Sequence, residues 1–329
     1  MIWGSAIVVA FVVGFAVKLG GLCTYAAALQ IVETRRFERL FAFLGAAAWA
    51  ALLVVPLAWA WDDTLQLTET HTGWAIAALG GAGLGVGAYL NRGCVFGTFV
   101  QLTSGNLTYV ATVVGMAAGS VGARHWLGNV APVAGIPTPA AVPSPAAWVW
   151  LAIAAVVAFI AVAGFGPQPA RKRLDLALIT VALGVGGGAL FAAIPRWNFA
   201  AVVNDVAWSL SGPLRPGPTL LTVACTVSMA VGALMAAVSQ HRFTLRAPRI
   251  RLMSGHFAGG ALMGGAAVLV PGGNDDLLLS GIPVLAFHAI VGFTVMVTTM
   301  VFLLKVAPNQ TGYHRMGVVS RISPWTARR

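Results

Sequence analysis

Two glycine-rich apolar stretches decide how this chain folds. The first is Gly83-Leu-Gly-Val-Gly-Ala-Tyr-Leu-Asn-Arg-Gly-Cys-Val-Phe-Gly97, and the second is Gly260-Ala-Leu-Met-Gly-Gly-Ala-Ala-Val-Leu-Val-Pro-Gly-Gly-Asn274. The pairs that match in their alignment are Leu90 with Leu269, Gly93 with Gly272, and Cys94 with Gly273. Each stretch has the pattern of a membrane helix that breaks at a glycine inside the apolar layer. Broken helices at matching places in two halves of a chain are the best sequence indication of a substrate site in a transporter.

Composition supports a membrane location for nearly all of the chain. Of its 329 residues, 58% are hydrophobic and only 9% are charged, whereas a soluble globular protein carries about 25% charged residues. Apolar runs of membrane-spanning length predict an all-α polytopic membrane protein with about nine spans. The first run follows no positive residue, so we expect a span there and not a signal peptide. The expected spans are about 2–20, 40–60, 74–90, 107–127, 147–164, 175–193, 218–239, 255–271 and 283–305.

The positive charges predict which side of the membrane each loop faces. Sixteen of the 20 Lys and Arg residues fall in the loops after the first, third, fifth and seventh spans or in the tail. They are Arg35, Arg36, Arg39, Arg92, Arg171, Lys172, Arg173, Arg242, Arg246, Arg249, Arg251, Lys305, Arg315, Arg321, Arg328 and Arg329. The positive-inside rule makes this side cytoplasmic and the N-terminus external. The same distribution accounts for the net charge of +11 without a nucleic-acid partner.

This orientation turns the two stretches into inverted copies, because one follows an inward span and the other an outward span. We expect a first repeat over 1–146, a connecting span over 147–164, a second repeat over 165–305, and a cytoplasmic tail over 306–329. A second, weaker pair matches Cys23 with Asn198. Four short re-entrant helices are therefore expected, at about 21–32, 94–103, 197–208 and 274–281. Non-helical backbone at membrane depth is tolerated where it is buried or lines a polar cavity, so these segments predict a constricted central pore.

The motifs resemble one known family. The Gly-x-Gly-Ala-x-Leu-x-x-Gly-Cys-x-x-Gly run at 85–97 and the Leu22-Cys23-Thr24 segment resemble the motifs of the YeeE/YedE sulfur-transport family. The run Gly272-Gly273-Asn274 is similar to its C-terminal motif, in which the family has Gly-Cys-Asn. The resemblance implies thiosulfate uptake across a bacterial inner membrane, with Cys23 and Cys94 as relay thiols. It also implies that a small cytoplasmic sulfurtransferase-like protein receives the sulfur, and that this chain is a divergent member lacking the third motif cysteine.

The chemistry of the expected site follows from its residue types. A small sulfur-containing dianion at mid-membrane needs donors without a permanent counter-charge, because a full positive charge would hold it too tightly. Helix N-termini and glycine N–H groups supply partial positive charge, and thiols are weak donors suited to a polarizable sulfur. The candidate site residues are Cys23, Cys94, Gly93, Asn198, Gly272, Gly273 and Asn274. We expect Cys225, alone within a span, to serve packing.

Other features limit the function or leave it open. Asp275 and Asp276 form an acidic pair expected near the outer mouth, where it would repel anions. The three cysteines make no Cys-x-x-Cys pair, and no nucleotide-binding loop is present, so we expect no metal, no cofactor and no enzyme activity. The alternative function is a non-transporting membrane scaffold that keeps the transporter fold. A polar pore would favour transport, and a pore plugged by Phe, Leu and Met would favour the scaffold.

Overall fold

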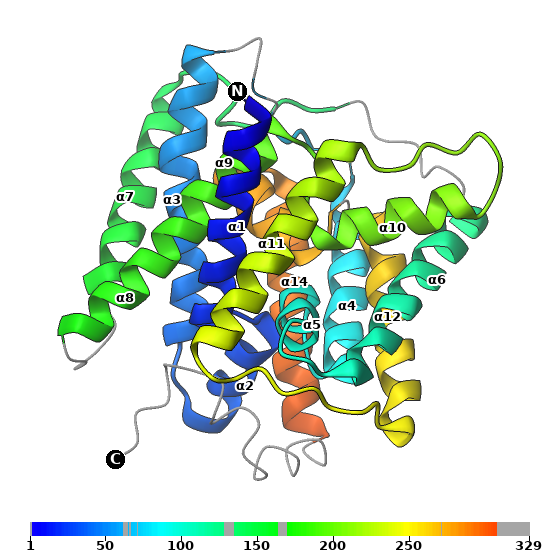
Figure 1. Cartoon of the computed structure of the whole chain (residues 1–329). Helices are drawn as coiled ribbons and strands as arrows, with labels where there is room; N and C mark the ends of the chain where they lie inside the picture. The colour runs from blue at the N-terminus through cyan, green and yellow to red at the C-terminus, as the bar shows by residue number, and fades with distance from the viewer. Residues whose placement is uncertain are drawn as a thin grey trace.

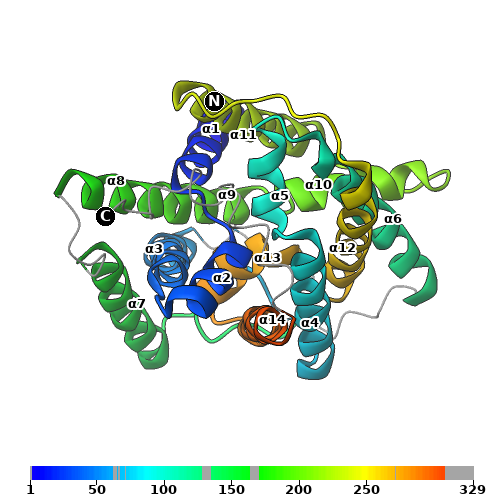
Figure 2. The ribbon, with the colours of Figure 1, turned by 90° about the horizontal axis from the view of Figure 1, so that it is seen from below.

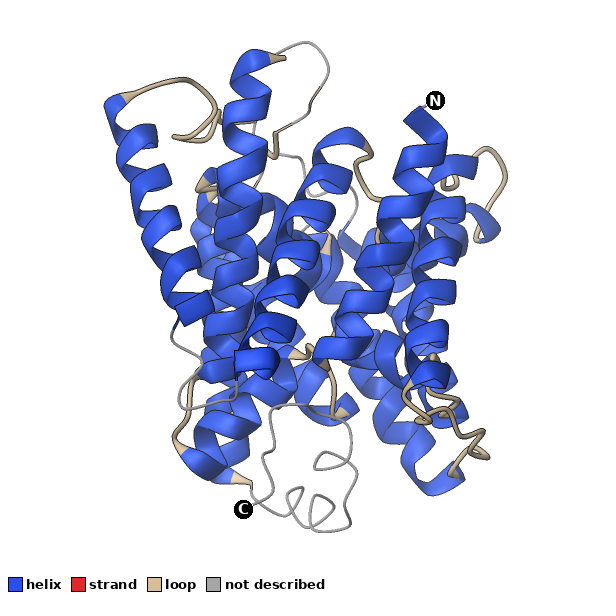
Figure 3. Ribbon diagram, turned by 60° about the vertical axis from the view of Figure 1, so that its left-hand side comes forward, coloured by secondary structure: helices blue, strands red, loops and turns tan. Residues whose placement is uncertain are grey.

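The structure, a computed structural model, describes residues 2–61, 65, 67–70, 72–127, 135–163, 170–270 and 272–307. Helices joined by loops make up this described part, and it contains no named strand (Figure 3). The apolar segments form helices because a helix satisfies its own backbone hydrogen bonds inside lipid. The prediction of an all-α polytopic membrane protein is therefore confirmed.

Long helices run between the two faces of the molecule (Figure 1). In the described residues they are α1 (Ile2–Gly20), α3 (Glu38–Ala60), α4 (Trp74–Asn91), α6 (Val110–Leu127), α7 (Pro145–Ala163), α11 (Leu220–Ser239), α12 (Ile250–Leu269) and α14 (Phe287–Val306). A further long helical stretch joins α8 (Ala170–Val181) through a π-helical turn, η2 (Ala182–Gly186), to α9 (Gly187–Ala193). These elements follow the expected spans closely.

Seven helical stretches in the described part of the chain are long and apolar enough to cross a membrane. Helices α4 and α6 were also expected as spans but are not among the seven. Glycines dilute the hydropathy of α4, and α6 carries Arg124 and His125 in its last turn. The exact number of nine spans therefore stays a prediction, as do the boundaries of the two inverted repeats. Of the tail expected over 306–329, residues 308–329 lie outside the described residues.

Part of the second glycine-rich stretch serves helix packing. Gly260 and Gly264 lie one turn apart on α12 and face Thr112 and Met116 on α6. A Cβ added at Gly264 would lie 2.7 Å from the Cα of Met116, and one at Gly260 would lie 2.9 Å from the Cα of Thr112. Small residues four apart let two membrane helices approach this closely. These two glycines fix the α6–α12 contact, whereas the glycines at the end of the stretch form the break.

Short helices lie among the long ones. They are α2 (Thr24–Thr34), α5 (Val95–Leu102), α10 (Phe199–Leu210) and α13 (Gly273–Asp276), and the last continues into a π-helical turn, η3 (Leu277–Gly281). Two single-turn 3₁₀ helices, η1 (Leu107–Tyr109) and η4 (Ile282–Val284), follow α5 and η3. Viewed from below, α2, α5 and α13 lie inside the ring of long helices (Figure 2). The four expected re-entrant segments thus coincide with four short helices.

Candidate functional site

Each short helix begins at or next to a candidate residue. Cys23, Cys94 and Asn198 are the N-caps of α2, α5 and α10, and all three have extended backbone angles. Gly272 is the N-cap of α13 and has a φ of +92°, a conformation that favours glycine. A residue with extended or left-handed backbone angles ends the preceding segment of the chain, and a new helix begins after it. The first N–H groups of this helix lack intrahelical partners. The expected starts at 21, 94, 197 and 274 therefore lie within about three residues of the observed starts at Thr24, Val95, Phe199 and Gly273.

The two thiols predicted to act together are in contact. The Sγ atoms of Cys94 and Cys23 lie 3.5 Å apart, and the backbone N–H of Thr24 donates to Cys94 Sγ over 3.2 Å. Cys94 is 1% exposed, whereas Cys23 is half-buried. The first turn of α2 thus lies against the first residue of α5. Cys225, in contrast, is fully buried within α11, and it lines neither of the two cavities described below.

Amide side chains connect the thiols to the second half of the chain. Asn274 Nδ2 donates to Thr24 Oγ1 over 3.3 Å, which joins α13 to α2. Asn198 Nδ2 donates to the Gly272 carbonyl over 3.2 Å, and Asn198 Oδ1 accepts from the N–H of Ala201 over 2.6 Å. Asn198 therefore caps its own helix and holds the break before α13. All seven candidate residues lie in or beside this group of helix N-termini.

The candidate glycines differ in the space around them. A Cβ added at Gly273 would have Ala200 Cβ and Val95 Cγ2 as neighbours, each 3.9 Å away. Gly273 therefore lies between α10 and α5, where a side chain would face both. A Cβ at Gly93 would have no neighbour closer than 3.7 Å. Gly272 has the least room of the candidates, because a Cβ there would overlap the side chain of Asp276. Gly97, in the first turn of α5, is also crowded, because a Cβ there would lie 2.6 Å from Cys23 Sγ.

A small cavity of about 60 Å³ reaches Cys23 from the face where α3 begins. Its walls include Arg39 and Arg92, together with Tyr25, Gly97 and Gln101. Arg39 is 5% exposed. The cavity thus has two guanidinium side chains in its wall and one of the paired thiols at its end. We call it the inner cavity.

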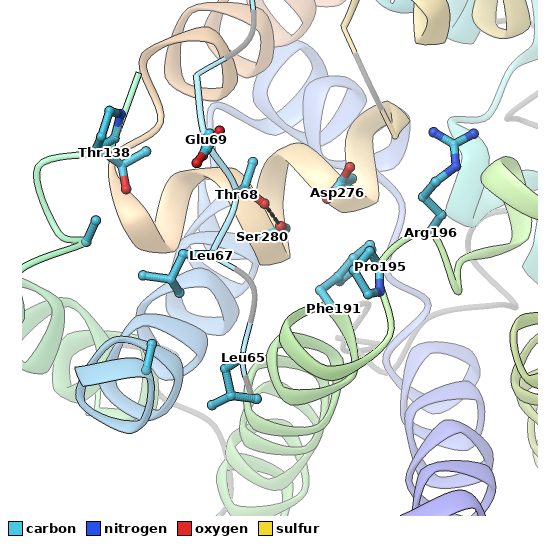
Figure 4. Close-up of a pocket in the computed structure, with 13 residues that line it drawn as sticks. Leu65, Leu67, Thr68, Glu69, Thr138, Phe191, Pro195, Arg196, Asp276 and Ser280 are labelled. Carbon is cyan, nitrogen blue, oxygen red and sulfur yellow. Dashed lines mark hydrogen bonds between the residues drawn. The ribbon is translucent and has the colours of Figure 1, made fainter. Parts of the chain in front are cut away.

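A larger cavity of about 650 Å³ lies near the opposite end of α3 and is called the outer cavity (Figure 4). Arg39 and Ala58 of α3, one from each cavity, are 19 positions apart, a rise of about 28 Å. The outer cavity is lined by Arg196, Asp276, Ser280 and Glu69 among others. Pro137, Thr138 and Ala141, which lie between α6 and α7, also line it, while residues 128–134 lie outside the described part.

A continuous series of contacts connects the two cavities. Cys23 lines the inner cavity and touches Cys94, whose sulfur accepts from the N–H of Thr24. Thr24 accepts from Asn274, which lies two residues before Asp276 of the outer cavity. The layer between the cavities therefore contains thiol, hydroxyl and amide groups. Aromatic side chains also link two of the short helices, since the ring of Phe99 in α5 packs against that of Phe199 in α10 in a tilted arrangement, at a centroid distance of 5.5 Å.

A buried polar network behind Cys94 was not found from the sequence. Asn91, 0% exposed, donates from Nδ2 to the Gly93 carbonyl over 2.7 Å and to Thr98 Oγ1 over 2.8 Å. Its Oδ1 atom accepts from Thr112 Oγ1 over 2.6 Å and lies 2.8 Å from Nδ1 of His256. The network ties the α4–α5 break to α6 and α12. A polar residue at the end of an apolar helix, two positions before Gly93 of the Gly-Cys pair, was the available signal.

Comparison with known proteins agrees with the geometry. A broken-helix, all-α membrane protein with polar cavities on both faces has the architecture of a membrane transporter. The family model described as "Sulphur transport" matches residues 19–203 and, in an overlapping second match, 140–302. The chain belongs to this sulphur transport (YeeE/YedE) family and is a transporter of sulfur compounds. A search of curated proteins gave no match.

Proposed function

We propose that this protein takes up a small sulfur-containing anion, most favourably thiosulfate, across the bacterial inner membrane. The anion would pass from the outer cavity through the layer of helix N-termini to the inner cavity. The observation that carries the proposal is the 3.5 Å contact between Cys23 and Cys94 at the point where α2 and α5 begin. In this pathway Gly93, Asn198, Gly272, Gly273 and Asn274 form the rest of the wall.

The donors of this layer suit a dianion that must also leave. The N-termini of α2, α5 and α10 offer partial positive charge and N–H groups. Thiols and the Asn274 amide add neutral donors. Full positive charges stand further out, on Arg39 and Arg92 at the inner cavity and on Arg196 at the outer cavity. Such an arrangement attracts the anion from both sides but does not bind it permanently at the constriction.

The orientation follows from the charge distribution. With the positively charged loops inside, the N-terminus is external, the C-terminus is cytoplasmic and the inner cavity opens to the cytoplasm. Cys23 would then be the last thiol on the path. A small sulfurtransferase-like protein would receive the sulfur there. The two repeats at 1–146 and 165–305 would supply two short helices each, from opposite faces.

Thiosulfate uptake in cells that depend on thiosulfate as sulfur source tests the proposal. We expect Cys94→Ala to reduce uptake on the order of 10-fold or more, because the central donor is lost and each such factor corresponds to about 1.4 kcal/mol. Cys23→Ala should also reduce thiosulfate uptake. Cys225→Ala is the matched control, since its thiol is buried in α11, and it should change uptake little. Equal uptake by all four proteins would refute the role of the thiols and leave a pore without a thiol relay, whereas absence of uptake in all four would favour the scaffold function.

A further inference from the structure

Two consecutive carboxylates lie on the proposed path and have no role in the pathway described so far. Asp276 lines the outer cavity together with Ser280. Figure 4 shows Asp276 and Arg196 on facing segments of the cavity wall. Asp275 lies one position deeper, 3% exposed. Negative side chains at the entrance of an anion pathway repel the substrate, so their presence needs a compensating charge.

The deeper residues have acceptor atoms without donors. Asp275 Oδ1 and Asn274 Oδ1 are both buried and have no hydrogen-bond partner in the described structure. Asn274 is 1% exposed, and its Nδ2 atom is already bonded to Thr24. A buried acceptor without a donor is unfavourable, and an isolated buried carboxylate is far more so. An anion cannot satisfy these atoms, because it brings further acceptors. A proton can, since a protonated carboxyl group is both uncharged and a donor.

Charge balance across the membrane gives an independent argument. A membrane potential of about 100 mV, negative inside, opposes the entry of a dianion by a factor on the order of 2,000 in its concentration ratio. An uncoupled pathway would therefore exclude the substrate that it is proposed to import. Two protons that enter with each dianion cancel its charge and remove this opposition.

We propose that Asp275 and Asp276 bind protons from the outer cavity and that these protons enter the cell together with the anion. The inference rests on the proposed function. Each carboxylate takes one proton from a hydronium ion in the outer cavity, which leaves water behind. The neutral pair no longer repels the dianion. As the anion moves past Cys94 and Cys23, the protons are released toward the inner side and the carboxylates return to their charged form.

The surroundings fit groups that gain and lose protons. The charged or titratable groups that act on the pair are Cys94 at the start of α5 and Arg196 ahead of α10, and the two carboxylates also act on each other. Arg196 is itself held by Asp205 through two hydrogen bonds of 2.9 and 2.5 Å. Asp205 therefore balances much of its positive charge, and the salt bridge of Arg196 in the described residues is with Asp205.

Purified protein in liposomes, loaded with a pH-sensitive dye and supplied with radiolabelled thiosulfate, tests the proposal. An outer pH about one unit below the inner pH should raise steady-state accumulation by about 100-fold if two protons are coupled and by about 10-fold if one is. Thiosulfate addition should acidify the interior, and a protonophore should abolish the accumulation. Asp275→Asn and Asp276→Asn should each lower the response to the pH gradient by at least about 10-fold. Asp175→Asn, on α8 away from the path, is the matched control and should respond like the unmodified protein.

Thiosulfate accumulation that does not depend on the pH gradient, or that depends on a sodium gradient instead, would overturn the proton assignment while leaving the transport function intact. Wild-type proton influx in both Asp275→Asn and Asp276→Asn would overturn the assignment to these residues. Absence of thiosulfate movement even down its own gradient would refute the proposed function itself, and proton coupling with it.

Discussion

Gly97→Ala probes the contact between the two thiols without removing either. A methyl group at this position would lie 2.6 Å from Cys23 Sγ, 3.6 Å from Cys23 Cβ and 4.0 Å from Cys94 Sγ. Since favourable contacts begin near 3.5 Å, the Cys23 thiol must withdraw by about 0.9 Å, which is 3.5 minus 2.6. The withdrawal changes the position of Cys23 relative to Cys94 and to the inner cavity that Cys23 and Gly97 both line, and this cavity holds only about 60 Å³.

The energetic terms partly offset each other, so the protein should still fold. Overpacking of this kind costs about 1–3 kcal/mol, while replacing Gly by Ala within a helix favours folding by about 0.5–1 kcal/mol. We therefore expect a small fall in melting temperature. Thiosulfate uptake should fall on the order of 10-fold or more, because a displacement of about 1 Å of a reacting or binding group can cost up to 100-fold.

Uptake and thermal unfolding should be measured on the same preparation. Gly122→Ala is the matched control, since a Cβ added there meets nothing within 4 Å, and it should leave uptake unchanged. Wild-type uptake by a stable Gly97→Ala protein would refute the argument that the position of Cys23 limits transport.

Three further predictions use other parts of the structure. Gly273→Cys restores the third thiol of the family motif and should preserve or raise thiosulfate uptake. The φ of +80° at this position makes any side chain cost about 1–2 kcal/mol of stability. A total loss of uptake in a folded protein would contradict the prediction. Asn91→Leu removes four buried hydrogen bonds. It should therefore lower the free energy of unfolding by about 3 kcal/mol and reduce uptake. An unchanged melting temperature would argue against the network. In intact cells, a membrane-impermeant maleimide should label Leu214→Cys but not Arg251→Cys, and the reverse pattern would overturn the predicted orientation.

The sequence predicted the central helix breaks well because their cause is local. A glycine or an N-capping residue after a long apolar run stops one helix and allows another to begin. Cys23, Cys94, Asn198 and Gly272 each occupy such a position, and each is the N-cap of a short helix. The all-α membrane fold likewise follows from the low charge of the chain, since hydropathy identifies most of the long helices, although α4 and α6 are not among those apolar enough to be identified in this way.

The partners of these residues could not be predicted in the same way. The bond from Thr24 N–H to Cys94 joins residues 70 positions apart, and that from Asn274 to Thr24 joins residues 250 apart. Such contacts depend on how the helices pack, and nothing in local sequence periodicity specifies them. The Asn91–His256 contact was missed for the same reason, because each residue alone is an ordinary polar side chain in an apolar helix.

The missing third cysteine has a consequence that depends on its place along the path. Gly273 lies on the outer side of the thiol pair, between Val95 and Ala200, and next to Asp275. A cysteine side chain there would lie close to Asp275, because Asp275 Oδ1 is 3.4 Å from the expected Cβ position. Under the proposed pathway, the soft sulfur donors are therefore confined to the inner half, and amide, carboxyl and backbone groups form the outer half. The substitution should change how the anion enters the constriction more than how it leaves toward the cytoplasm, so Gly273→Cys should alter the concentration dependence of uptake before it alters the maximal rate.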